Sequence, residues 1–173
     1  MATTTAKYYK RDFWSKENLK YVEPHFRLSK AARIVNQLAR GRECDLLDVG
    51  CGPATLAKLL DRNIHYYGID IAIHNPAPNL LQADFAENPI AFGGRRFDLI
   101  VATNIFIYYD VFEQSLCLRN VETMLRRGGF LLTNNALLEL PSSGVHSVDY
   151  LTVVYSDRPD DGDHIVWYQR AAD

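Results

Sequence analysis

The stretch "DLLDVGCGPAT", residues 45–55, has the pattern of a short buried strand that runs into a glycine turn. Gly50 and Gly52 lie two residues apart, and Thr55 stands where a dinucleotide-binding G-x-G-x-x-G motif has its third glycine. Glycines allow a ligand to approach the backbone where a Cβ would collide. Pro53 predicts a helix over "PATLAKLLD", whose first N–H groups and positive dipole end would suit a carboxylate.

The rest of the chain predicts an α/β fold with a Rossmann-like, mostly parallel sheet and helices on both faces. A helix after Pro24 is indicated by an apolar face with spacings of three and four residues, and Gly41 is its expected end. A second helix is expected over residues 110–127, with Asp110 as its cap and Gly128–Gly129 as its end. Four further strands are predicted at "HYYGID", "NLLQAD", "RFDLIVAT" and "GFLLTN".

Two connections shape the predicted sheet. Only "IAIHNPAP" separates the second strand from the third, and Pro76 and Pro78 disfavour a helix there, so either the crossover is an extended loop or the third strand is short or displaced. "YLTVVYSD" and "DHIVWYQR" are joined by the turn sequence "RPDDG", which predicts a C-terminal antiparallel hairpin. We expect residues 23–173 to form a single domain and residues 1–22, which are polar and aromatic, to form a lid segment.

Composition excludes several classes of protein. The 173 residues carry a net charge of −2, so no electrostatic footprint for nucleic acid is expected. No apolar run approaches the roughly 18 residues of a membrane span, and the N-terminus lacks the apolar core of a signal peptide, which predicts a cytoplasmic protein without membrane contact. The three cysteines lack the spacing of a disulfide framework, and no cluster has metal-ligand spacing, so no metal is expected.

In open parallel sheets, ligands bind beyond the carboxyl ends of the strands. An acid after the second strand can accept both hydroxyls of a ribose, and Asp84 could accept a hydrogen bond from an exocyclic amine. Ile71 and Phe85 could sandwich a flat base. The residues at the predicted strand ends are Asp48, Gly50, Cys51 and Gly52, then Asp70 and Ile71, Asp84 and Phe85, Thr103 and Asn104, and Asn134 and Asn135.

The order of these residues also selects among nucleotide-like ligands. Thr55 in place of the third glycine argues against a pyrophosphate, and Asp48 suits an ammonium group better than a phosphate. A ligand with a ribose, an adenine and an amino acid therefore fits better than NAD. An NAD-dependent oxidoreductase stays a rival because the Asp70 position is common to both kinds of site.

The same residues carry a resemblance to a known family. "LLDVGCGPAT" resembles motif I of the class I S-adenosylmethionine-dependent methyltransferases, "YYGIDIA" their ribose-acid segment and "LQADFAE" their adenine-contacting segment. "FDLIVATNIFIYYD" and "MLRRGGFLLTNN" resemble the segments of strands four and five, so the likeness covers about residues 44–170. Ala54, where many members have a glycine, and the short connection after the second strand are departures from the family pattern.

This resemblance implies S-adenosylmethionine as the cofactor. It implies that Asp48 and the turn Gly50–Cys51–Gly52 hold the methionine moiety, that Asp70 holds the ribose, and that Asp84 and Phe85 contact adenine. Thr103 and Asn104 would line the site beside the methyl group. The methyl group would move by in-line displacement, and the sequence singles out no catalytic base.

The acceptor has to be inferred from weaker features. The N-terminal segment resembles small-molecule methyltransferases of bacterial secondary metabolism, whereas "TNIFIYYDVFEQSL" resembles methyltransferases nearer the chemotaxis-receptor type. We expect a small-molecule acceptor; a protein side chain such as a carboxylate, or a methyltransferase-like module that binds cofactor without catalysis, are the alternatives. The sequence leaves the oligomeric state open. Candidate acceptor contacts are Tyr8, Trp14, Tyr108, Tyr109 and His146.

Overall fold

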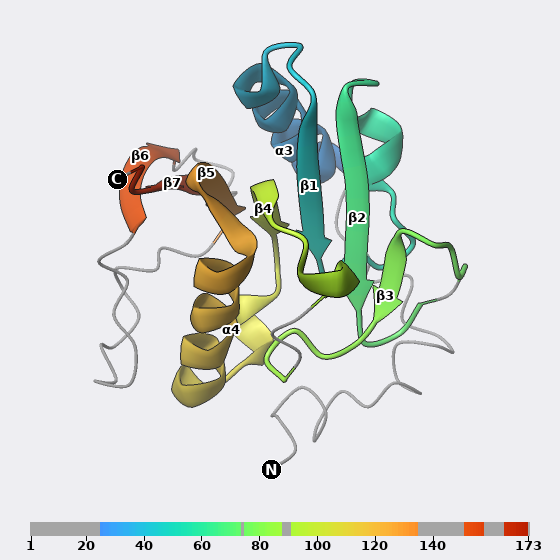
Figure 1. Cartoon of the computed structure of the whole chain (residues 1–173), viewed down its shortest axis with the longest axis vertical. Coiled ribbons are helices and arrows are strands. Elements are labelled where there is room, and N and C mark those ends of the chain that lie inside the picture. The colour runs from blue at the N-terminus through green and yellow to red at the C-terminus, as the bar shows by residue number, and fades with distance from the viewer. Residues whose placement is uncertain (1–24, 74, 88–90, 135–150, 158–164, 173) are drawn as a thin grey trace.

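The computed structural model describes residues 25–73, 75–87, 91–134, 151–157 and 165–172. They form one seven-stranded sheet in the order β3-β2-β1-β4-β5-β7-β6, seen in Figure 1. The strands are β1 (Cys44–Val49), β2 (Ile64–Asp70), β3 (Leu80–Gln82), β4 (Phe97–Ala102), β5 (Leu125–Thr133), β6 (Leu151–Asp157) and β7 (Ile165–Arg170). The α-helices are α3 (His25–Ala39) and α4 (Val111–Met124), and the 3-10 helices are η2 (Leu56–Leu59), η3 (Phe92–Gly94) and η4 (Phe106–Tyr108).

The pairing of the strands confirms the predicted Rossmann-like sheet. The first five strands in chain order pair in parallel, and β7 pairs antiparallel with both β5 and β6. The C-terminal antiparallel hairpin is therefore confirmed, and its turn lies outside the described residues. Residues 1–24, which include the predicted lid segment 1–22, also lie outside the described residues.

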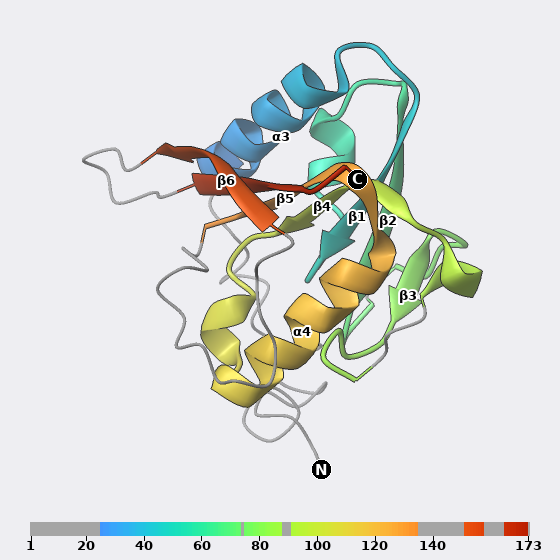
Figure 2. The same cartoon turned by 60° about the vertical axis from the view of Figure 1, so that its left-hand side comes forward.

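Helices cover both faces of the sheet, as predicted. Side chains alternate along each strand, so a strand with consecutive apolar residues presents an apolar surface on both faces. Leu46 of β1 packs with α3 on one face, and its neighbour Leu47 packs with α4 on the other. Figure 2 shows the two helices on opposite sides of the strands. Neither of these described helices is long and apolar enough to cross a membrane.

The helix expected at Pro53 does not form. The turn continues to Ala54, which has a left-handed backbone with a φ of 56°, and only the single 3-10 turn η2 follows. Leu56 is buried against the α3 face of the sheet. Asn36 of α3 bonds to the carbonyl of Leu59 and the amide of Asp61, which fixes the end of this short segment. A short 3-10 helix packed against α3 therefore stands where an α-helix was predicted, and the expected helix dipole is absent from this segment.

The end of α4 also differs from the prediction. The helix ends at Met124, and the pair Gly128–Gly129 lies inside β5 rather than terminating the helix. A Cβ on Gly129 would come within 2.7 Å of the carbonyl oxygen of Asp98, so glycine allows β5 to approach β4 closely. Arg170 of β7 donates to the carbonyls of Glu122 and Leu125, which satisfies acceptors at the end of the helix. The Asp110 cap and its partner Glu113 are confirmed as a full capping box.

The structure resolves the alternatives for the connection between β2 and β3. β3 is short, at three residues, and the described residues between it and β2 contain no helix. Asn79 anchors the loop, because its side chain donates to the carbonyl of Tyr66 and its own carbonyl accepts from the amide of Gly68. The crossover is thus an extended segment that returns directly to the sheet edge.

A charge network ties together the amino ends of the strands. Asp45 is buried at the start of β1, and one of its oxygens accepts from Arg95 and Arg126, each at 3.1 Å. His65 of β2 lies 3.3 Å from its other oxygen. Arg126 also pairs with Asp98 of β4 at 2.6 Å, so these contacts connect β1, β2, β4 and β5.

We expect Asp45→Asn to lower the free energy of unfolding by about 1.5–3 kcal/mol, the scale of hydrogen bonds to charged groups. The buried position of Asp45 and its two arginine partners are the reason. The control is Glu43→Gln, which removes a largely exposed pair with His65 and should change stability by less than about 1 kcal/mol. Urea unfolding measures both values, and equal effects of the two variants would contradict a special role for Asp45.

Candidate functional site

Three carboxylates lie at the carboxyl ends of three adjacent strands. Asp48 is the penultimate residue of β1, Asp70 is the last residue of β2, and Asp84 comes two residues after β3. Because β3, β2 and β1 are neighbours and run parallel, their carboxyl ends meet at one edge of the sheet. The sequence-predicted acids are thus brought together by the topology.

Asp70 is joined to the glycine turn. One of its oxygens accepts from the amide of Gly52 at 2.8 Å, and the other accepts from the amide of Ala72 at 2.9 Å. Gly52 has a φ of 49°, and apart from its chain neighbours no atom of the described residues lies within 4 Å of the place that its Cβ would take. The half-buried Asp70 carboxylate is therefore held in one orientation, and the described residues leave room beside Gly52.

The first part of the turn is packed more tightly. The amides of Gly50 and Cys51 both donate to the carbonyl of Ile69, at 2.8 and 3.2 Å. A Cβ on Gly50 would lie 1.9 Å from Cδ1 of Ile105, so only glycine fits between β1 and the segment after β4. Cys51 is buried, and its sulfur occupies the space beside Gly68 of β2. Its thiol therefore packs against the sheet, and the turn presents backbone at Gly52.

Asp48 has a partner that the sequence reasoning missed. The hydroxyl of Tyr66 donates to an oxygen of Asp48 at 2.7 Å, and both side chains belong to the face of the sheet that α3 covers. The signal was present in the alternation of "YYGID", because Leu46 pairs with Tyr66 and Asp48 with Gly68 across the two strands. Burial, reinforced by the charge of Asp48, raises the pKa of the Tyr66 hydroxyl well above its usual range, which keeps it a donor.

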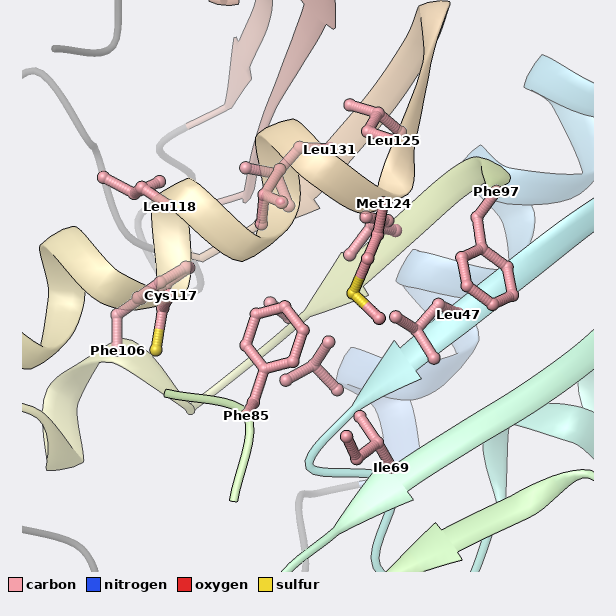
Figure 3. Packing of buried hydrophobic residues seen from close by; sticks show 14 of the residues in the cluster. Leu47, Ile69, Phe85, Phe97, Phe106, Cys117, Leu118, Met124, Leu125 and Leu131 are labelled. Atoms are coloured by element: carbon pink, nitrogen blue, oxygen red, sulfur yellow. The ribbon is translucent and has the colours of Figure 1, made fainter. Parts of the chain in front are cut away.

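The segment after β3 gives its two predicted residues different environments. One oxygen of Asp84 accepts from the amide of Ala86 and from the hydroxyl of Tyr109, each at 3.0 Å. Phe85, expected to sandwich a base, is 3% exposed and lies in the core beneath α4, as Figure 3 shows. Its ring is part of the core packing and is not available for stacking on a base. Ile71, the other expected stacking residue, is half-buried directly after β2.

The ends of β4 and β5 are joined by two asparagines. The amide of Asn104 donates to Oδ1 of Asn134 at 2.8 Å, and Nδ2 of Asn134 donates to Oδ1 of Asn104 at 2.6 Å. Asn104 has a φ of 55°, in the left-handed region that asparagine tolerates better than most residues. Thr103 beside it is buried. This pair fixes the backbone that carries Ile105 onto Gly50.

The candidate acceptor residues are only partly placed. Tyr108 is half-buried at the end of η4. Tyr109 is 8% exposed and bonded to Asp84, which argues against its expected contact with an acceptor. Tyr8, Trp14 and His146 lie outside the described residues, as does Asn135. Within the described part of the chain, no three His, Cys, Asp or Glu residues are placed so that they could share a metal ion.

Comparison with known proteins identifies relatives. The model of a family described as a methyltransferase domain matches residues 24–172. The structure resembles magnesium protoporphyrin IX methyltransferase from Synechocystis PCC 6803, solved with bound S-adenosylmethionine, with a TM-score of 0.66 at 15% identity over 99% of this chain and 98% of that one. It also resembles a ribosomal protein L11 methylase from Lactobacillus delbrueckii, with a TM-score of 0.59 at 16% identity over 86% and 81% of the two chains. None of the curated protein sequences matches the chain.

Three buried cysteine thiols and one buried tyrosine hydroxyl make the stability of this protein sensitive to high pH. Burial raises the pKa of Cys44 to about 11 and moves those of Cys51, Cys117 and Tyr66 well above their usual ranges. Their stabilising contribution is complete below the unfolded-state values, about 8.5 for cysteine and 10 for tyrosine. It is lost at higher pH, because the unfolded chain releases protons that the folded chain retains.

We therefore expect the free energy of unfolding to fall steadily above about pH 9. Cys44→Ala should reduce the steepness of this fall between the unfolded-state pKa and about 11, where the Cys44 thiol titrates in the folded protein. Urea unfolding at a series of pH values measures the slope. Stability that stays constant up to pH about 10.5 in the wild type would contradict the assignment.

We expect Asn104→Ala to destabilise the protein by about 1 kcal/mol more than Asn104→Gly, because a left-handed backbone costs alanine strain that glycine escapes. Both variants lose the bond that the Asn104 side chain accepts from Nδ2 of Asn134, so the difference between them isolates the cost of the left-handed backbone. Urea unfolding gives the comparison. A glycine variant at least as unstable as the alanine variant would show that φ is not the deciding constraint.

Proposed function

This chain belongs to the class I S-adenosylmethionine-dependent methyltransferase family, and we propose that it transfers the methyl group to a small-molecule acceptor. The observation that carries the cofactor part of the proposal is the set of three carboxylates at adjacent strand ends beside the open face of Gly52. The family match also decides against the oxidoreductase alternative.

The described residues fit this cofactor chemically. Carboxylates are acceptors, and the parts of S-adenosylmethionine that a protein must recognise are donors or cations: an ammonium group, a sulfonium, ribose hydroxyls and an exocyclic amine. A phosphate-bearing ligand would meet three negative charges at this edge. Gly52 adds the close backbone approach that a ligand beside Asp70 needs.

Each acid has a proposed task. Asp48, fixed by Tyr66, would attract the ammonium group of the methionine moiety, with the turn Gly50–Gly52 against it. Asp70 would accept from the ribose hydroxyls, and Asp84 from the amine of adenine. Thr103 and Asn104 would line the site near the reacting groups.

The bound cofactor supplies a methyl group already activated by the positive sulfur. The residues of the chain then have to align an acceptor for in-line attack and to keep water out of the site. The asparagine pair after β4 and β5 would support this alignment, because the Asn134 side chain bonds to both the backbone amide and the side chain of Asn104. We assign no general base.

Support for a small acceptor comes from the extent of the structural match and from the short connections between the described strands. The porphyrin methyltransferase matches it over almost the full length of both proteins. The described connections between β1 and β4 are short and contain no inserted domain that would grip a macromolecule. A protein carboxylate is the second candidate, favoured by the resemblance of residues 103–116 to chemotaxis-receptor-type methyltransferases.

Asp70→Ala tests the cofactor site. We expect it to weaken binding of S-adenosylhomocysteine by about 1.5–3 kcal/mol, the scale of charge-assisted hydrogen bonds. The matched control is Asp61→Ala, an exposed aspartate on the turn before β2, which should leave affinity unchanged. Titration calorimetry measures both variants. Unchanged affinity in Asp70→Ala would reject the ribose role, and no binding by the wild type at millimolar ligand would reject the cofactor site itself.

The acceptor class is tested with S-adenosylmethionine labelled in its methyl group. The wild-type protein is incubated with a panel of small phenols, carboxylic acids, amines and porphyrins, and separately with a protein mixture. We expect label in the small molecules. Base-labile label in the protein fraction alone would favour the protein-carboxylate alternative.

A further inference from the structure

The hydroxyl of Tyr109 reaches from the segment after β4 to the acid after β3. It donates to Oδ1 of Asp84 at 3.0 Å, and the amide of Ala86 donates to the same oxygen at 3.0 Å. Two donors on one oxygen fix the rotation of the carboxylate and therefore the direction in which its other oxygen points. Tyr109 is 8% exposed, so this bond is largely shielded from water.

We propose that Tyr109 is a positioning residue that sets the selectivity of this site for adenine, by holding Asp84 in the orientation that accepts from the 6-amino group. The proposal rests on the proposed function, in which Asp84 contacts the adenine of the cofactor. It gives Tyr109 a role in cofactor recognition in place of the acceptor contact that the sequence suggested.

The tyrosine end of the bond is rigid. Nε2 of Gln114 in α4 donates to the carbonyl of Tyr109 at 2.9 Å and to that of Phe106 at 2.8 Å. The next residue, Asp110, caps α4 through bonds in both directions with Glu113. The backbone that carries Tyr109 is thus fixed to the first turn of a helix.

The aspartate end is rigid as well, and its support comes from the same helix. The Asn120 side chain donates to the carbonyl of Phe85, and the Phe85 ring is packed in the core beneath α4, as Figure 3 shows. Asp84 and Tyr109 therefore sit on two backbones that α4 holds in a fixed relation. The hydrogen bond from the Tyr109 hydroxyl links these two backbones and restricts the rotation of the Asp84 carboxylate.

A fixed carboxylate discriminates between bases by charge. It accepts from the 6-amino group of adenine, and it repels the 6-carbonyl of a deaminated base. Sites built to bond a donor reject analogues that lack the donor, because a buried polar group is then left without a partner. A carboxylate that can rotate away from the carbonyl loses much of this discrimination.

The test compares the binding of S-adenosylhomocysteine and its deaminated analogue, S-inosylhomocysteine, by titration calorimetry on the full chain. The wild type should prefer the adenosyl ligand. Tyr109→Phe should weaken the adenosyl ligand about fivefold to tenfold, the worth of one net hydrogen bond. It should leave the inosyl ligand nearly unchanged, so that the preference falls by the same factor.

Tyr67→Phe is the matched control, because it removes a hydroxyl from a partly buried tyrosine that packs against Phe92 and Phe97 of the same core. It should keep the wild-type preference. In an Asp84→Asn background, Tyr109→Phe should have little further effect on the preference, because the two residues act as one unit.

The outcomes separate the two levels of the proposal. A wild type that binds neither ligand would overturn the proposed function and this inference with it. A wild type that binds both ligands equally would overturn the selectivity while leaving the cofactor site standing. If Tyr109→Phe weakened the binding of both ligands equally, Tyr109 would have only a structural role and the proposed role in selectivity would be overturned.

A second variant keeps the test decisive if Tyr109→Phe does not fold. Tyr109→4-aminophenylalanine replaces the hydroxyl with another donor of nearly the same size. It should retain the preference for the adenosyl ligand. Loss of that preference in the folded 4-amino variant would overturn the proposal.

Discussion

The hydrogen bond from the amide of Gly52 to the carboxylate of Asp70 joins the glycine turn of the site to the acid at the end of β2. It closes the turn after β1 onto the end of β2, and it depends on a left-handed backbone at Gly52 that glycine adopts without strain. The parallel pairing of β1 with β2 brings the two partners to the same edge of the sheet. Together with the bond from the amide of Ala72 to the other oxygen, this contact sets the orientation of the acid.

The other support of the site is α4. Its first turn anchors Tyr109 through Gln114, and its middle anchors the segment after β3 through Asn120 and the buried Phe85. The helix is itself fixed at both ends, by the Asp110 capping box and by Arg170 from β7. The antiparallel end of the sheet is therefore connected, through one helix, to the acid that we assign to adenine.

The sequence predicted much of the fold correctly because its signals are local. Alternating apolar strands, the Asp110 cap and the C-terminal hairpin all depend on residues close in the chain. It was wrong where distant contacts decide. The helix after Pro53 is replaced by a 3-10 turn packed on α3, and Gly128–Gly129 serves a close approach of β5 to β4 instead of a helix end.

For the site, the sequence by itself determined which residue types stand at the strand ends: the acids Asp48, Asp70 and Asp84 and the glycine turn, whose order in the chain indicated the family. The tertiary structure alone decided which atoms they face. Tyr66 reaches Asp48, Tyr109 reaches Asp84, and the ring of Phe85 turns into the core. Strand order and register, which join residues far apart in the chain, set these contacts. A local pattern indicates which face of a strand a side chain takes, as it does for Tyr66, but it does not show which distant residue that side chain meets.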